Sequence, residues 1–499
     1  MNINYKSREE QKVFEKYIEE KKIQLPALGK YCGMDYKEIF RILKGKGELP
    51  DEDILQKIMS YMQLTPSEKR NILKVYEITQ IGKEKYYMRR QVQAFLEEFP
   101  EYFHADRKSD ILKIFTEPSD ENNRNCIPLF NQTEINQYLH YICIREARKQ
   151  KNSRICLIMQ PDHKFAMELL QSLKTINEDL VIEHVISIDK TEKMSENMEF
   201  YNLRYLKNLL PLYINAMNYN VYCMEGNLQS YGEELPGFSN IFLTEDYVLV
   251  CTADFGRGIL YNSPETKEYF CKRYNSFRDQ SRELFHVVVN VQNQMENLGD
   301  MGWDKRLSYA IQPEPCLISL MPPELTEAVV YQKLPERAFL LPHFQAFIEN
   351  AHTRIQKGLN YFYCTKEGLD HFAKEGRLPE APEEVYRPFL PEERIFLMNK
   401  ALPLCRKGYF RFLKRPLDHL TANLHLCVNE KEGYLLFRNI HGENIYLIIH
   451  DRKLLWTFWD FLSSLDDKIL YTGEETAAYF EKVIAELQDK MKNDMCCCD

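Results

Sequence analysis

The chain has 499 residues, of which 44% are hydrophobic, and carries a net charge of −9 at pH 7. This length exceeds what one hydrophobic core usually organises, so we expect several domains. Its longest apolar runs are strand-sized and its first twelve residues hold no apolar core, which argues against membrane spans and a signal peptide and favours a cytoplasmic protein.

The charge is unevenly distributed along the chain. Residues 1–96 hold 19 Lys and Arg against 14 Asp and Glu, a balance of +5, and the remainder carries −14. A polyanion would therefore be attracted to the N-terminal part and repelled by the rest.

The 14 cysteines form no C-x-x-C pair, which argues against a disulfide framework in a reducing compartment. Most of the eleven single cysteines lie in apolar stretches and are predicted to be small core residues. Cys496–Cys498 are interpreted as part of a frayed tail, with a soft-metal site as the alternative.

The first hundred residues read as almost wholly helical. Ser7–Ile23 opens with a capping-box pattern, Pro50–Leu64 places three acids in its first turn, and Thr65–Ile81 combines an N-cap threonine with Pro66 and Glu68. A further helix, Glu84–Phe99, is expected to connect domains or to mediate dimerisation.

Between the first two of these helices, the stretch 25–50 predicts two short helices that meet at a glycine. Gly33 permits the left-handed turn that ends the first, Asp35 is a good N-cap for the second, and Met34 would fill the space between them. Ile39, Ile42 and Leu43 would then face inward.

This pattern resembles the helix-turn-helix of the Cro/repressor (XRE) family over Leu25–Lys69, about a tenth of the chain. The matching scaffold positions are Leu28, Gly29, Gly33, Met34, Asp35, Ile39 and Gly45, followed by the apolar positions Ile54, Ile58, Met62 and Leu64. Gly29 departs from the family, which usually has alanine there, and Glu38 places an acid on the second helix.

The resemblance implies that the second helix enters the major groove of DNA with its N-terminal residues at the base edges. The candidate DNA-binding residues are Tyr36, Lys37, Glu38, Arg41, Lys44 and Lys46. Lys37 and Arg41 suit guanine, Lys44 and Lys46 suit phosphate, and Glu38 could accept a hydrogen bond from cytosine. The alternative is a hairpin of the same shape that docks onto protein.

From about residue 126, predicted helices and strands alternate, which favours an α/β region with a largely parallel sheet. A second segment begins near residue 300, with strands expected at 315–321, 359–365, 409–414, 424–439 and 444–451. Residues 381–394, rich in Pro and Glu, read as a linker or surface loop. A weak echo between residues 263–270 and 473–480 hints at two related α/β units, although chance similarity of helix starts explains it equally well.

The larger part of the chain lacks the usual catalytic motifs: no G-x-x-x-x-G-K-[ST], H-E-x-x-H or G-x-S-x-G is present. The alternation brings phospholipase-D-like halves to mind, but that chemistry requires H-x-K, which also does not occur. We therefore predict no enzymatic activity and no cofactor, and leave enzymatic activity open for residues 126–490.

Three further features have both a functional and a structural interpretation. His425 and Cys427 on one strand could contribute to a metal site, although a histidine satisfied by a neighbour is the simpler reading; we predict no metal. His163 could head a helix and bind an anion. The aromatic stripe of Trp456, Phe458, Trp459 and Phe461 predicts core, or otherwise a subunit or ligand surface.

The sequence thus predicts a multidomain protein: an all-α helix-turn-helix domain (1–80), a connector (81–125), an α/β domain (126–298), a second α/β or α+β domain (299–490) and a disordered tail (491–499). The predicted function is that of a bacterial, cytoplasmic transcription regulator. It would bind double-stranded DNA as a homodimer and respond to an unknown small-molecule or protein effector, with no membrane partner. The alternatives are an enzyme and an interaction scaffold.

Overall fold

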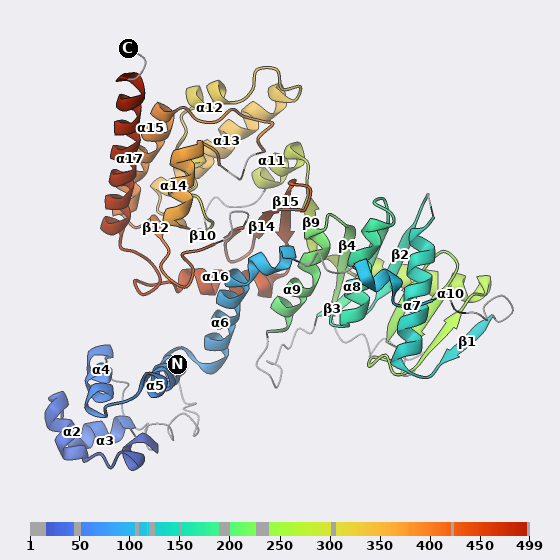
Figure 1. Cartoon of the computed structure of the whole chain (residues 1–499), viewed down its shortest axis with the longest axis horizontal. Coiled ribbons are helices and arrows are strands. Elements are labelled where there is room, and N and C mark those ends of the chain that lie inside the picture. Colours follow the sequence, from blue (N-terminus) through green and yellow to red (C-terminus); the bar gives the residue numbers. More distant parts are fainter. Residues whose placement is uncertain are drawn as a thin grey trace. The chain divides into compact units, whose positions relative to one another are not determined.

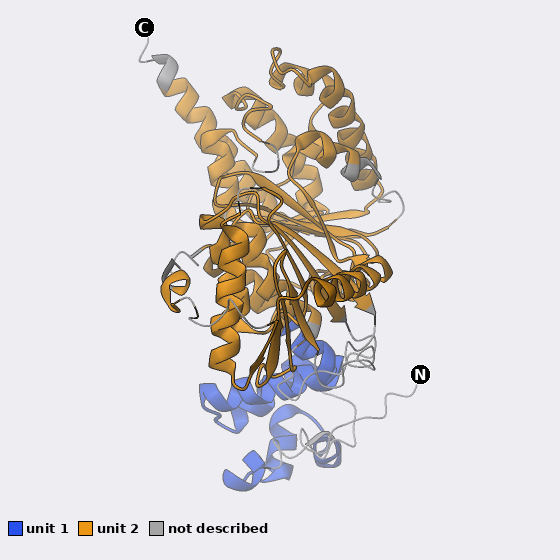
Figure 2. Cartoon of the chain, turned by 90° about the vertical axis from the view of Figure 1, so that its right-hand side faces the viewer, with its two compact units in different colours: residues 1–90, 196–199 blue, residues 91–195, 200–499 orange. Residues whose placement is uncertain are grey.

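The computed structural model describes residues 16–43, 51–104, 109–116, 118, 125–149, 151–188, 200–225, 239–300, 306–378, 380, 382–420 and 424–496. Contacts divide the chain into unit 1, residues 1–90 with 196–199, and unit 2, residues 91–195 with 200–499 (Figure 2). The sequence predicts boundaries near residues 80, 125 and 298, whereas this division falls inside one helix, Lys83–Glu97.

Unit 1 is helical. Of the expected first helix, residues 16–20 are described and are helical. It continues with α2 (Leu25–Cys32), α3 (Tyr36–Leu43), α4 (Glu52–Tyr61), α5 (Pro66–Ile81) and the start of α6 (Lys83–Glu97). Their shared core includes Leu28, Ile39, Leu55, Ile58 and Ile72, none of which is exposed at all.

Two of the helix starts expected in unit 1, those of α4 and α5, have capping hydrogen bonds, whereas the start expected at Ser7 lies outside the described residues. The Asp51 carboxylate accepts from the Ile54 amide at 2.8 Å, which caps α4. Thr65 and Glu68 form the reciprocal capping box of α5, with the Thr65 amide donating to Glu68 Oε2 at 2.6 Å. Such caps each stabilise a helix end by about 1 kcal/mol.

Unit 2 contains two mixed sheets. The first has eight strands in the order β1-β7-β6-β5-β2-β3-β4-β8, and only the β2–β3 and β3–β4 pairs are parallel. Its strands are β1 (Cys126–Leu129), β2 (Arg154–Ile158), β3 (Val181–Ile188), β4 (Asn218–Glu225), β5 (Asn240–Leu243), β6 (Val248–Cys251), β7 (Gly258–Tyr261) and β8 (Arg282–Glu283). The expectation of a largely parallel sheet therefore holds only for β2, β3 and β4, which helices connect. Strands that are joined by hairpins must be antiparallel.

Four helices accompany this sheet: α7 (Gln132–Ala147), α8 (Lys164–Ser172), α9 (Tyr201–Ile214) and α10 (Pro264–Gln280) (Figure 1). Helix α10 packs its buried Phe270 and Tyr274 on one face, against Ile158 and Ile241 among others. Helices α8 and α9 connect the parallel strands β2, β3 and β4, which is the arrangement expected of α/β crossovers.

The second sheet has seven strands in the order β12-β11-β10-β13-β14-β15-β9. The strands are β9 (Phe285–Val288), β10 (Ser308–Ile311), β11 (Asn360–Cys364), β12 (Phe410–Phe412), β13 (His425–Val428), β14 (Gly433–Arg438) and β15 (Asn444–Ile449). The helices are α11 (Val291–Asp300), α12 (Pro323–Val329), α13 (Arg337–Gln356), α14 (Lys366–Glu375), α15 (Pro391–Arg406), α16 (Arg452–Ser463) and α17 (Gly473–Cys496).

The two sheets share one connectivity. In each, three parallel strands joined by helical crossovers lead into an antiparallel three-strand meander, whose last strand pairs with the strand that opens the half. The two sheets also agree at the edge next to the last parallel strand. In the first sheet β8 pairs antiparallel with β4, and in the second Leu470 forms an antiparallel bridge with Leu413, the residue after β12. Unit 2 is thus built from two related halves.

The sequence echo that suggested two halves does not coincide with this repeat. Helix α10 directly follows the meander of the first half, and its counterpart after the second meander is α16. The echo instead equates α10 with α17, which lies one element later. The evidence for two related units is therefore the shared strand order and strand pairing, and not the sequence echo.

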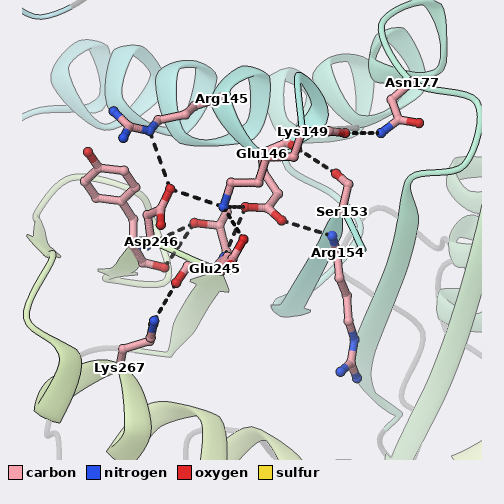
Figure 3. Close-up of polar contacts among 11 residues, drawn as sticks. Arg145, Glu146, Lys149, Ser153, Arg154, Asn177, Glu245, Asp246 and Lys267 are labelled. Carbon is pink, nitrogen blue, oxygen red and sulfur yellow. Dashed lines mark hydrogen bonds and ion pairs between the residues drawn. The ribbon is translucent and has the colours of Figure 1, made fainter. Parts of the chain in front are cut away.

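A polar network anchors the meander of the first half to α7 (Figure 3). The buried Glu146 carboxylate accepts from the Lys149 ammonium at 2.9 Å and from the Arg154 and Glu245 amides, both at 3.1 Å. Lys149 also contacts Glu245 at 2.7 Å and Asp246 at 3.1 Å. Because nearly every charge in it has a partner, this network has a structural rather than a chemical role.

Several sequence expectations need correction. Residues 317–320 form a 3₁₀ helix, not a strand. The expected loop at 381–394 contributes Val385, Tyr386 and Phe389 to the core and leads into α15, because its apolar residues are interspersed among the charges. Helix α17 continues to Cys496, so the described part of the expected disordered tail is helical.

The second half of α6 belongs to unit 2. Phe95 and Phe99 are fully buried, with ring centroids 5.8 Å from Phe458 and 6.1 Å from Phe437 respectively. These side chains pack in the core of unit 2, and the role of this helix as a connector or in dimerisation stays a prediction.

Of the eleven cysteines in the described residues, seven are buried and none forms a disulfide, in line with their prediction as core residues. Among the described helices, none combines the length and the apolarity needed to cross a membrane.

Candidate functional site

The turn between α2 and α3 has the predicted geometry. Gly33 adopts φ 74°, ψ 27°, the left-handed conformation that only glycine adopts without cost. Asp35 accepts the Lys37 amide at 2.7 Å, which caps α3. Met34 is half-buried and packs against the core of unit 1.

Gly29 explains how closely the two helices approach. A Cβ atom at this position would lie 2.9 Å from the Met34 carbonyl oxygen and 3.3 Å from Tyr36 Cα. The Gly29 carbonyl also accepts the Met34 amide at 2.9 Å. In this chain the turn is therefore packed against glycine itself, and the alanine usual in the family would require a shift of a few tenths of an ångström.

The outer face of α3 carries the predicted contact residues. Tyr36, Lys37, Glu38 and Arg41 are all exposed, and none of their side chains joins a hydrogen bond or ion pair among the described residues. The core-facing Ile39 is completely buried on the opposite side. One residue was missed by the sequence analysis: Phe40, a large apolar side chain on the same helix, is 44% exposed.

Part of the predicted surface cannot be placed. Lys44, Gly45 and Lys46 lie outside the described residues, as do the side chains of Ile42 and Leu43. Their assignment as phosphate contacts, turn and core therefore stays a prediction.

A second site, a cavity in unit 2, lies between the second sheet and the helices α11 and α13. The sheet lines one side of it with Ala310 on β10, Gln312 directly after β10, Cys427 on β13, Tyr434 on β14 and Tyr446 on β15. Apolar side chains cover it from the helices: Val291, Met295, Phe344, Phe347 and Ala351. Most small-molecule sites combine such apolar walls with a few polar groups.

One end of the cavity is acidic and incompletely hydrogen-bonded. Glu380 lines it and accepts from the Gln312 amide at 2.7 Å, while its Oε2 has no partner among the described residues. Burial raises the pKa of Glu380 to about 7. Burial, together with the charge of Glu380, raises the pKa of the neighbouring Glu314 to about 8, and Glu314 Oε2 also lacks a partner.

His425 lies next to Glu380. It is 3% exposed, its Nδ1 lies 4.0 Å from Glu380 Oε1, and neither ring nitrogen has a hydrogen-bond partner in the described chain. Burial lowers its pKa to about 3, so the imidazole is neutral. The described residues therefore do not supply the neighbour that the simpler reading of His425, a strand histidine satisfied by a neighbour, expects.

Cys427 shares the strand face with His425 and lines the cavity. Across the described residues, no three His, Cys, Asp or Glu side chains are arranged to hold a metal ion. The structure therefore does not assemble the metal site considered for His425 and Cys427.

The remaining candidates have structural roles. His163 Nδ1 accepts the Ala166 amide at 3.2 Å and its ring stacks on Phe255 at 3.7 Å, so the residue caps α8 itself in place of an anion. Burial lowers its pKa, which keeps this nitrogen an acceptor. In α16, Phe458 and Phe461 are core, whereas Trp456 is 38% exposed.

Comparison with known proteins adds little. No family model matches the chain, and no curated protein matches it. One solved structure similar to it is that of TrmBL2, an archaeal chromatin protein described with a novel mode of DNA binding: the match covers 55% of this chain and all of that one, at 9% identity and a TM-score of 0.22. Another is polyphosphate kinase from Porphyromonas gingivalis, with 73% of this chain and 55% of that one covered, 10% identity and a TM-score of 0.21. Similarity this low identifies neither fold nor function, and the proposals below do not use it.

Proposed function

We propose that this protein is a sequence-specific, DNA-binding transcriptional regulator. Unit 1 binds double-stranded DNA through α3, and unit 2 responds to an effector and holds a homodimer. The observation that carries the proposal is the outer face of α3. It presents a tyrosine, a lysine and an arginine whose side chains have no hydrogen bond or ion pair among the residues that the structure describes, on a helix that Asp35 caps and Ile39 anchors.

Physical chemistry supports this use of the surface. Holding long basic side chains exposed and unpaired costs little in water, and such side chains are available to phosphates or to the O6 and N7 atoms of guanine. The positive balance of residues 1–96 favours association of this part of the chain with a polyanion.

The test uses the full-length protein. Sites are selected from random double-stranded DNA, and binding is measured as a function of salt for wild type and for Lys37→Ala/Arg41→Ala. We expect a loss of about 1–3 kcal/mol for each base contact removed, with relaxed sequence preference. Lys57→Ala, which removes an exposed charge from α4 in the same unit, should bind like wild type.

Two results would reject the proposal. One is wild-type protein that shows no salt-dependent DNA binding at low ionic strength. The other is unchanged affinity and selected sequence in the double variant, which would place the DNA contacts elsewhere.

The exposed aromatic side chains of the same helix favour a second function. Tyr36 is 48% exposed and Phe40 44% exposed, with the acidic Glu38 between them. Aromatic side chains are enriched at the centre of protein interfaces, and an acid opposes phosphate. Docking of this helix onto another protein is therefore the alternative function. Wild-type protein that shows no salt-dependent DNA binding at low ionic strength would favour it.

A further inference from the structure

The cavity of unit 2 exists because small residues stand where the first half has large ones. The β2–β5 and β10–β13 ladders have three pairs each, and we align them at their middle pairs, Leu157–Phe242 and Ala310–Cys427. Ala310 is then the counterpart of Leu157, and Cys427 is the counterpart of Phe242. Leu157 and Phe242 are fully buried. The same sheet position is thus filled in the first half and open in the second.

The polar groups at the cavity differ in the same way. By register, Gln312 and His425 correspond to Met159 and Asn240 of the first half. Asn240 donates to the Thr252 carbonyl at 2.8 Å, so the first-half position is satisfied within the chain. In the second half, the described chain gives His425 and the outer oxygens of Glu314 and Glu380 no partner.

This end of the cavity therefore has an excess of acceptors. Glu380, which lines the cavity, and its neighbour Glu314 each have one oxygen without a hydrogen-bond partner among the described residues. A buried polar atom left unpaired costs about 1–3 kcal/mol. Burial raises the pKa of both acids, and the groups that oppose it, Gln312 at Glu380 and Arg438 near Glu314, do not offset it. Glu314 Oε1 has a contact, the His371 ring nitrogen Nδ1 at 3.3 Å. A species that brings N–H donors and a positive charge would satisfy both needs.

The walls of the cavity define the rest of such a species. Phe344 and Phe347 from α13 and Tyr434 and Tyr446 from the sheet surround the space next to Glu380. Aromatic faces attract organic cations as well as apolar groups. An ammonium group on an aromatic or aliphatic body matches this lining.

We propose that this cavity binds an organic ammonium ion, with its cationic head at Glu380 and Gln312 and its apolar body between α13 and the sheet. Binding shifts Glu380 to its ionised form, so affinity rises with pH through the neutral range. Any role of this ligand as an effector rests on the proposed function in transcription; its binding does not.

Isothermal titration of the full-length protein without DNA tests the proposal. Three probes share one ring: 2-phenylethylamine, the neutral 2-phenylethanol and the anionic 3-phenylpropionate. At pH 8.0 we expect the amine to bind at least tenfold tighter than the alcohol. At pH 5.5, where Glu380 is protonated, this preference should largely disappear.

Two isosteric variants locate the head group. Glu380→Gln should lose the preference for the amine and still bind 2-phenylethanol, which shows that the cavity is intact. Glu383→Gln, a matched change at a carboxylate that is 57% exposed on the same segment, should behave like wild type. Thermal melting of each variant confirms that it is folded.

The proposal is overturned if the amine and the alcohol bind equally at pH 8.0, if none of the probes binds, or if the anion binds best. The last result would place the recognition at Arg354, a buried guanidinium elsewhere in the cavity lining. Because no DNA is present, these results are independent of whether α3 binds DNA.

Discussion

The two halves of unit 2 follow the same path, yet their interiors differ. In the first half the centre of the sheet is filled by Leu157 and Phe242, and the buried Glu146 is bonded to a lysine and two backbone amides. In the second half Ala310 and Cys427 border a cavity, and Glu380 Oε2 and both ring nitrogens of His425 have no hydrogen-bond partner among the described residues. One topology thus supports a scaffold in one copy and a candidate site in the other.

Two of the three buried histidines among the described residues lie on sheet strands, and these two differ in their hydrogen bonding. His184 on β3 has both ring nitrogens occupied, by the Tyr219 hydroxyl at 2.6 Å and the Met159 carbonyl at 2.9 Å. Neither ring nitrogen of His425 has a hydrogen-bond partner in the part of the chain that the structure describes. Because buried polar groups are normally satisfied, this histidine and the unpartnered oxygen of Glu380 beside a cavity are the observations on which the proposed ligand site rests.

The largest expected effect is on packing. Phe242→Ala should lower the free energy of unfolding by about 3–5 kcal/mol, because it removes a fully buried ring and leaves a void. Cys427→Ala, the change at the corresponding position, should cost about 1 kcal/mol because its side chain already borders open space. Denaturant unfolding of both variants measures the difference between the two losses of unfolding free energy. Equal losses would contradict the conclusion that the centre of the sheet is filled in the first half and borders a cavity in the second.

The buried carboxylates provide the next comparison. Glu146→Gln should lose about 3 kcal/mol, since it breaks a buried ion pair and leaves donors unpaired. Glu380→Gln should be neutral or stabilising at pH 8, because it removes an uncompensated charge. Glu245→Gln, at a carboxylate of the same network that is 67% exposed, is the control and should change stability by less than about 1 kcal/mol. A larger loss for Glu380→Gln than for Glu146→Gln would reverse this interpretation.

The smallest effect concerns pH. The folded-state pKa values of Glu380 and Glu314, about 7 and about 8, lie above their unfolded values, so the folded state binds more protons through the neutral range. Stability should therefore fall by on the order of 1–2 kcal/mol as pH rises from 6.5 to 8. The buried histidines do not contribute there, because their lowered pKa values matter only below about pH 6.5.

Thermal melting across this pH range measures that slope. Glu314→Gln/Glu380→Gln should flatten it, and Glu146→Gln should leave it unchanged. A wild-type stability that increases from pH 6.5 to 8 would show that neither acid is held protonated.

Local patterns in the sequence were sufficient for most elements. The caps at Asp35 and Thr65, the turn at Gly33 and the buried position of Ile39 depend on neighbours within a few residues, and the structure has them as predicted. The 3₁₀ helix at 317–320 and the buried segment after residue 381 were misread, because packing against α13 and α15 overrides their local composition.

The candidate cavity could not be found in this way. Its acidic end joins Gln312, Glu380 and His425, which are up to 113 positions apart and carry no shared motif. A signal was present in His425, the histidine of an alternating strand, but its lack of a partner is a property of the folded interior alone.

The sequence by itself determined the helical character of unit 1, the capped turn that presents α3, and the α/β character of the rest, because these depend on short-range sterics, capping and periodicity. Only the tertiary structure decided that unit 2 contains the same topology twice. It also decided that large side chains fill the centre of the first sheet, whereas small ones border a cavity at the corresponding place in the second. That difference depends on which side chains are neighbours across a sheet. The strand register determines these neighbours, and the register itself is set by the whole fold.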